Sequence, residues 1–225
     1  MLWRLSRHVG AILFLALAGS AQAVVLPPGA TVNLPGTTVA ADPALAGVVE
    51  IDELVPFSFA AGGGTISGDV QVRVVRSSVD NTLDFYWRIF NDSESSGAIG
   101  SFRIGDFFSG VYDADWRIDG LGDVAPTSAT RFSGAFDSFV NFNFGNQLAP
   151  GLESRFIFLD TNAVSYARNA IYDLTNLGQT QISGLFSTYG PIATVPEPAS
   201  VALVAIALAA FVWVSRRKPV LTRSR

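Results

Sequence analysis

The reactive side chains that this sequence concentrates in one place are carboxylates. Five aspartates lie within residues 106–123, DFFSGVYDADWRIDGLGD, and they are Asp106, Asp113, Asp115, Asp119 and Asp123. Asp113 and Asp115 are two residues apart, so a strand would present both on one face. Such a pair can supply the acid and base of glycoside hydrolysis, and the neighbouring Trp116 can stack on a sugar. The interpretation we favour is a polar loop, because Asp is a common turn residue.

Calcium binding is the second chemistry that these aspartates allow. Oxygen ligands suit Ca²⁺, and extracellular sites tolerate weak binding. Asp113, Asp115 and Asp119 have the spacing D-x-D-x-x-x-D, followed by Gly. The pattern lacks the third alternate ligand and the closing Glu of an EF-hand loop. We therefore expect no cofactor and no metal. Calcium is the alternative, and Asp113, Asp115 and Asp119 are its candidate ligands.

Other catalytic chemistry is excluded by the residue types that the chain lacks. It has no Cys, and its single His and single Met are His8 and Met1. Beyond residue 23 there is no imidazole base, no thiolate nucleophile, no disulfide and no His or Cys metal ligand. We expect a protein that is not an enzyme, with a carboxylate-based hydrolase as the remaining enzymatic alternative.

Charge is distributed unevenly along the 225 residues. The net charge of the chain is −4, whereas residues 24–195 hold eight Arg, no Lys and eighteen Asp plus Glu, a net charge of −10. The two ends are basic. An acidic body argues against nucleic acid as a partner, because a phosphate backbone needs clustered Lys and Arg.

The elements that must position the carboxylates have the period of β-strands. Apolar and polar residues alternate over residues 66–74 and 83–89, with a hairpin loop at residues 77–81 between them. Similar short patterns occur at residues 55–60, 98–107, 115–118, 129–132, 139–144, 154–159, 165–174 and 181–186. They predict an all-β fold, an antiparallel β-sandwich-like ectodomain over residues 48–194. Phe85 and Trp87 are expected in its core.

Two segments of the body do not fit this strand pattern. Residues 24–47 are rich in Pro, Gly, Ala and Thr, which is typical of an extended leader rather than of a core element. Residues 162–169 are the only candidate for a helix.

Residues 1–23 have the three parts of a secretory signal peptide. A basic start precedes the apolar run of residues 9–18, and Ala21 and Ala23 form a small-x-small cleavage site. The apolar run is far shorter than the roughly 20 residues of a spanning helix. We expect the general secretion machinery to export the chain and signal peptidase to cut after Ala23. An uncleaved anchor is the alternative.

Residues 195–218 join three features in a fixed order. A Pro-Glu-Pro motif comes first and consists of Val195, Pro196, Glu197, Pro198, Ala199 and Ser200. An apolar run follows at residues 201–214. A basic cluster comes last and consists of Arg216, Arg217 and Lys218. A single transmembrane helix over residues 199–215 is expected, with the stop-transfer cluster 216–218 and the tail 219–225 in the cytoplasm. The body between the two ends then lies outside the inner membrane.

The order of these parts resembles the PEP-CTERM sorting signal of Gram-negative bacteria. The resemblance implies that an exosortase recognises Pro196, Glu197 and Pro198, cuts near them, and sends the body to the cell surface or the extracellular matrix. The inner membrane would then hold the protein only transiently. Because both prolines disfavour helix in the residue before them, the motif is expected to be extended and exposed just outside the bilayer.

The two ends together favour an exported protein with a structural or adhesive role in an exopolysaccharide matrix or biofilm. Extracellular polysaccharide is the expected partner. One alternative is a carbohydrate-binding module or carboxylate-based glycoside hydrolase at the cell surface. The other is an uncleaved, membrane-anchored periplasmic protein.

Overall fold

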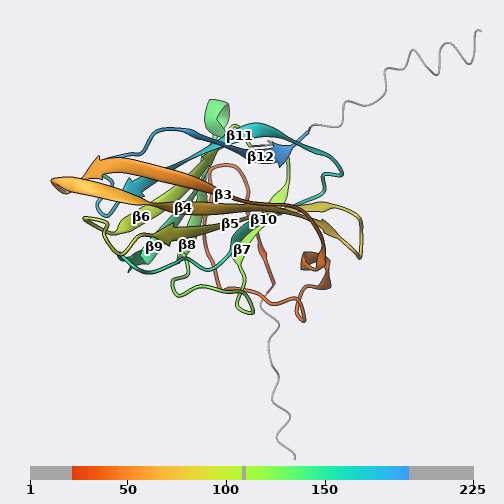
Figure 1. Ribbon diagram of the computed structural model, residues 1–225. Coiled ribbons are helices and arrows are strands. Elements are labelled where there is room, and N and C mark those ends of the chain that lie inside the picture. The colour runs from red at the N-terminus through yellow and green to blue at the C-terminus, as the bar shows by residue number, and fades with distance from the viewer. Residues whose placement is uncertain (1–21, 108–109, 193–225) are drawn as a thin grey trace, which may run out of the picture.

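The computed structural model describes residues 22–107 and 110–192, which form two six-stranded antiparallel sheets packed face to face (Figure 1). Sheet A has the strand order β1-β7-β10-β5-β4-β3, and sheet B has the order β12-β11-β6-β9-β8-β2. The predicted all-β, antiparallel two-sheet fold is confirmed. The predicted C-terminal helix and residues 1–21 of the predicted signal peptide lie outside the described residues.

Sheet A and sheet B take six strands each from along the chain. Sheet A contains β1 (Val24–Val25), β3 (Gly47–Ala61), β4 (Gly64–Ser77), β5 (Leu83–Asn91), β7 (Tyr112–Trp116) and β10 (Ile157–Thr161). Sheet B contains β2 (Thr31–Asn33), β6 (Ile99–Gly105), β8 (Ser128–Arg131), β9 (Val140–Leu148), β11 (Tyr166–Asn176) and β12 (Phe186–Pro191). Two short 3₁₀ turns, η1 (Pro43–Leu45) and η2 (Gly134–Phe136), complete the described elements.

The expected helix over residues 162–169 does not form. Its first residues turn away from β10, and β11 begins at Tyr166. The reason is pairing with β12, in which Tyr166 lies opposite Pro191 and Ala167 lies opposite Gly190. In a helix these residues could not pair with β12 across the sheet.

The β4–β5 hairpin lies where the sequence predicted it. β4 ends at Ser77 and β5 begins at Leu83. The Ser77 amide donates to the Thr82 carbonyl at 2.9 Å, and Asn81 takes φ 65°, a left-handed conformation that Asn tolerates. This hairpin fixes which side chains of β4 and β5 face the core.

The core between the sheets is built from the alternating apolar residues of both layers. Val70, Val72 and Val74 of β4 and Phe85, Trp87 and Ile89 of β5 are buried against sheet B, as expected for Phe85 and Trp87. The Trp87 ring lies 6.0 Å from that of Phe102 in β6. Its Nε1 donates to Thr188 Oγ1 of β12 at 2.9 Å, so one side chain links the two sheets.

Trp87→Phe is expected to lower the free energy of unfolding by about 2 kcal/mol, because it removes this hydrogen bond and leaves space in a closed core. Urea denaturation followed by circular dichroism measures the change. Thr188→Val is the partner variant, and the double variant should lose less than the sum of the two single losses. Strictly additive losses would contradict a direct link between these side chains.

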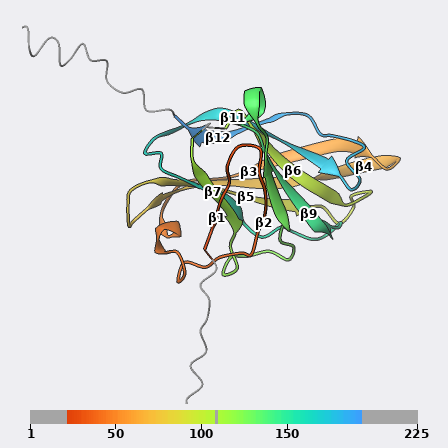
Figure 2. The same cartoon turned by 180° about the vertical axis from the view of Figure 1, so that it is seen from behind.

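Residues 24–47 are part of the folded body rather than an extended leader outside the core. β1 pairs with β7 at the edge of sheet A, and β2 pairs with β8 at the edge of sheet B (Figure 2). Leu26 and Leu34 are buried in the core between the sheets, and Leu45 is buried on the outer face of sheet A. The physical reason is burial of three leucines, which outweighs the turn-forming composition around them.

Candidate ligand site on the outer face of sheet A

The outer face of sheet A carries side chains that β4, β5, β10 and β7 turn away from the core. Strand register arranges them in two rows, which are Arg73, Tyr86, Phe158 and Asp115, and then Val75, Asp84, Asp160 and Asp113. Part of this face is covered by residues 37–46. Val39 and Leu45 of that segment pack in an apolar cluster with Tyr86 and Phe158, and the Tyr86 hydroxyl donates to the Leu45 carbonyl at 3.2 Å.

A cavity of about 240 Å³ opens beside this cover, and we call it the Arg notch. Its lining residues are Arg73, Val75, Tyr86, Arg117, Asp119, Gly120, Leu121 and Phe156. Val75, Tyr86 and Phe156 are buried and supply apolar surface, whereas Leu121 is exposed. The notch therefore combines an apolar lining with two guanidinium groups and one carboxylate.

Both arginines of the Arg notch are held in place by neighbours. Arg73 Nη2 donates to Asp52 Oδ2 at 2.7 Å, and its guanidinium carbon lies 4.7 Å from the centre of the Phe156 ring. Arg117 Nε donates to Asp119 Oδ1 at 2.7 Å. These contacts orient the guanidinium planes in advance, which lowers the entropy lost when a ligand binds.

The structure places Asp113 and Asp115 on one face of β7, as the sequence predicted. Trp116 points to the opposite face, where it packs on the core and donates from Nε1 to the Leu34 carbonyl at 3.2 Å. The alternative of a carboxylate pair beside a sugar-stacking Trp is therefore not formed. The favoured interpretation, a polar loop, is wrong for Asp113 and Asp115, because β7 pairs with β10 and holds both in a strand. The alternation of a strand already indicated the direction of Trp116. Residues two apart share a face, so Trp116 lies on the same face as the buried Ala114 and opposite to Asp113 and Asp115.

Four of the five predicted aspartates, Asp106, Asp115, Asp119 and Asp123, have identifiable local positions or contacts. Asp115 Oδ1 accepts from the Gly36 amide at 2.8 Å, and burial raises the pKa of Asp115 to about 6. Asp119 pairs with Arg117 at the Arg notch, and Asp123 accepts from the Glu153 amide at 3.2 Å. Asp106 lies at a bend with φ 53°.

The three calcium candidates, Asp113, Asp115 and Asp119, do not converge as one ligand set. Within residues 22–107 and 110–192, no group of three or more His, Cys, Asp or Glu side chains is placed to hold a metal ion. The contacts of Asp115 and Asp119 explain this, because a main-chain amide and an arginine already occupy oxygens of these carboxylates.

The sequence did not predict a facing pair of carboxyls, the buried Asp84 and the half-buried Asp160. They lie directly opposite each other on β5 and β10. Asp84 is 0% exposed and neither of its oxygens has a partner among the donors of the described residues. Burial raises the pKa of Asp84 to about 10, helped by the charge of Asp160, and burial also raises the pKa of Asp160 to about 6. The pair therefore retains a proton at neutral pH.

A two-sheet antiparallel β protein is the class that the described residues define. In the part of the chain covered by the structure, no helix is long and apolar enough to span a membrane. The predicted span over residues 199–215 lies outside that part, as do the motif 195–200, the basic cluster 216–218 and Ala21. Ala23 is described, and it packs against the apolar cluster on the outer face of sheet A.

Comparison with known families identifies the C-terminal segment. Residues 194–218 match the PEP-CTERM protein-sorting motif, so the predicted sorting signal is confirmed. This motif indicates an exported protein that an exosortase sorts to the cell surface. No curated protein and no solved structure matches the chain.

Proposed function

We propose that this protein is a non-enzymatic structural or adhesive component of the cell surface or extracellular matrix, cut by an exosortase near its Pro-Glu-Pro motif. The observation that carries the proposal is the position of the sorting motif. β12 ends at Pro191, opposite Tyr166 of β11, and the Ile192 amide donates to the Ser165 carbonyl at 3.0 Å. The motif match begins at residue 194, so a cut near the motif would leave every described strand with its neighbours.

The contacts of Asp115 and Asp119 and the burial of Asp84 favour a role without catalysis. A carboxylate-based glycoside hydrolase needs an acid and a base that face one sugar bond. Asp115 is bound to a main-chain amide, Asp119 is paired with Arg117, and Asp84 is 0% exposed. We also propose that the protein acts without a cofactor.

Pro196→Ala combined with Pro198→Ala is expected to abolish processing, because it removes the extended geometry that we propose the exosortase reads. Intact-mass analysis should find wild-type surface protein that starts at Val24 and ends near the motif. The double variant should keep its C-terminal residues and stay in the inner membrane fraction.

Pro219→Ala, in the same tail but outside the motif, is the matched control and should be processed normally. Deletion of the exosortase gene should reproduce the effect of the double variant. Unchanged mass and location in both experiments would contradict sorting and support the anchored periplasmic protein.

A carbohydrate-binding module is the second candidate, and the Arg notch favours it. Sugar sites combine apolar surface with a few placed polar groups, and the notch offers Phe156 and Tyr86 together with Arg73, Arg117 and Asp119. Extracellular polysaccharide is the proposed partner. Co-sedimentation with polysaccharide without release of reducing ends would support a module, whereas release would support a hydrolase.

A further inference from the structure

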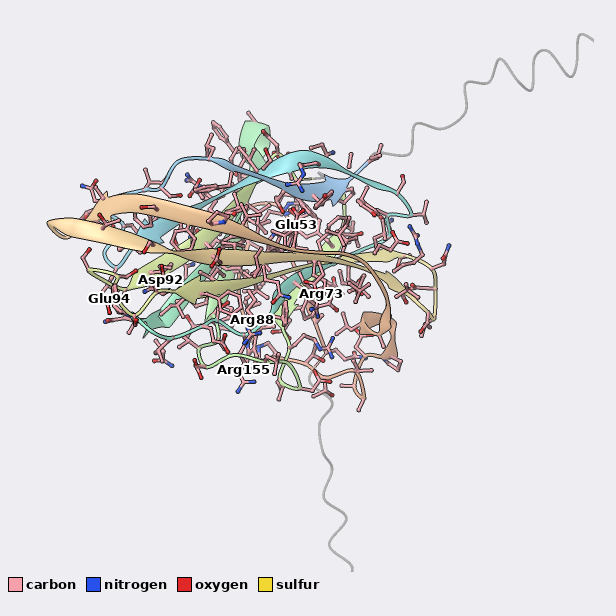
Figure 3. All side chains as sticks on the ribbon, viewed as in Figure 1. Glu53, Arg73, Arg88, Asp92, Glu94 and Arg155 are labelled. Carbon is pink, nitrogen blue, oxygen red and sulfur yellow. The ribbon has the colours of Figure 1, made fainter. Side chains whose placement is uncertain are left out.

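Three of the eight arginines of the body, Arg73, Arg88 and Arg117, lie on the outer face of sheet A. The guanidinium carbons of Arg73 and Arg88 lie 4.7 and 5.6 Å from the centre of the Phe156 ring. Figure 3 shows Arg73 and Arg88 on the same side of sheet A. Arg117 joins them at the Arg notch. In a body with a net charge of −10, these guanidinium groups lie together, and each is paired with one carboxylate, of Asp52, Glu153 and Asp119 in turn.

One buried hydrogen-bond donor of the Arg notch has no acceptor. Arg73 Nε is buried and has no partner, while Arg73 Nη2 is bound to Asp52. A guanidinium has five N–H donors in a planar fork that matches a carboxylate. Because an unsatisfied buried donor is costly, an acceptor that a ligand brings to Arg73 Nε, by displacing the atoms that now cover it, would gain more than at a solvated arginine.

The size and remaining lining of the Arg notch limit the ligand to a small polar ring. Its volume of about 240 Å³ is smaller than the roughly 300–1,000 Å³ typical of sites for drug-sized molecules. Tyr86, Phe156 and Val75 provide apolar surface for the C–H face of a sugar, and Asp119 provides an acceptor for its hydroxyl groups.

We propose that the Arg notch binds one carboxylate-bearing sugar, a uronic acid unit of an extracellular polysaccharide. Arg73 and Arg117 bind the carboxylate, and Asp119 accepts from a ring hydroxyl. This proposal rests on the proposed function, since it names the sugar class with which a surface or matrix protein of this kind would associate.

Binding of the purified surface protein to polygalacturonate tests the proposal, with neutral dextran as the reference polymer. We expect co-sedimentation with polygalacturonate alone, reversed by free D-galacturonate and not by D-galactose, which lacks the carboxylate. Arg73→Gln should weaken binding at least tenfold. Arg73→Lys should bind with an affinity between those of the wild type and Arg73→Gln, because an ammonium keeps the charge but loses the planar pair of donors that a guanidinium offers to a carboxylate.

Arg103→Gln is the matched control. Arg103 pairs with Asp173 of β11 at 2.7 Å, the distance at which Arg73 pairs with Asp52, but it lies on sheet B. This variant should bind like the wild type, and thermal melts should show that both Gln variants are folded. Equal binding to dextran, equal competition by D-galactose, or equal effects of the two Gln variants would overturn the proposal. Sorting is measured separately by intact mass, so its failure is distinguishable.

Discussion

Asp84→Asn should stabilise the fold at pH 8 by about 3 kcal/mol and by much less at pH 5. Asp84 is 0% exposed, and its pKa is raised to about 10 by burial and by Asp160 across the strand pair. The nearby Asp42 and Asp80 add repulsion of the same sign. An Asn side chain keeps the shape, carries no charge and can donate to Asp160, so it relieves the cost of a buried acid.

The sign of the pH dependence follows from the raised pKa values. At pH values between the ordinary pKa of 3.8 and the folded value, Asp84 is protonated in the folded state and ionised in the unfolded state. Its contribution to stability is therefore complete below pH 3.8 and is lost as the pH rises, by up to about 1.4 kcal/mol per unit. Asp160 and Asp115, with pKa values of about 6, add losses between pH 4 and 6.

Urea denaturation at pH 5, 6.5 and 8 measures this dependence. The wild type should be more stable at pH 5 than at pH 8, and Asp84→Asn should flatten the difference. Glu94→Gln changes an exposed carboxylate between β5 and β6 (Figure 3), and it should keep the wild-type slope. A wild type that is equally stable at pH 5 and pH 8 would show that the pair of carboxyls is not protonated.

The alternation of residue types predicted the strands and their faces where one face meets the core. Phe85 and Trp87 lie inward and Asp84 and Tyr86 outward, as the period of two requires. What the alternation could not show is that residues 37–46 cover part of the outward face. That cover depends on contacts between distant residues, such as the bond from the Tyr86 hydroxyl to Leu45.

The last predicted strand shows a limit of local pattern. Residues 181–186 were expected to pair, but β12 runs from Phe186 to Pro191, and Ile182 forms only an isolated bridge with Thr175. Ile182 and Leu185 are exposed, so their side chains gain little from a ladder at this position.

The Arg notch was beyond reach of the sequence for a different reason. Arg73, Arg117 and Phe156 are far apart in the chain, and they meet only because the sheet order is β7-β10-β5-β4. Alternation predicts that a side chain faces outward, but it carries no information on which strands become neighbours. The sorting motif is the opposite case, because its three parts lie within 25 consecutive residues, 194–218.

Arg131→Met is expected to lower the free energy of unfolding by about 4 kcal/mol, among the largest losses for a single side chain in this fold. Arg131 is 1% exposed, and its hydrogen-bond acceptors are three backbone carbonyls. Nε donates to Asp137 at 2.8 Å, and Nη1 donates to Leu26 at 3.2 Å and to Gly110 at 2.8 Å. Met fills much of the volume but leaves these carbonyls without donors.

The stacking of Arg131 on Tyr112, with its guanidinium carbon 4.3 Å from the ring centre, adds a packing term that a Lys side chain does not reproduce. Arg131→Lys should therefore lose about half as much stability as Arg131→Met. Arg155→Met is the matched control, because Arg155 Nη1 also donates to two carbonyls but at the surface, and it should cost at most about 1 kcal/mol.

Limited proteolysis separates a local role of Arg131 from a general loss of packing. The bond to Leu26 fixes the chain just after β1, so Arg131→Lys should first expose residues 24–34 to cleavage while β4 and β5 stay protected. Uniform cleavage across the sheets would instead mean that the cation supports the whole core. Equal denaturation midpoints for Arg131→Met and Arg155→Met would refute the assignment, because burial is the property by which these two arginines differ most.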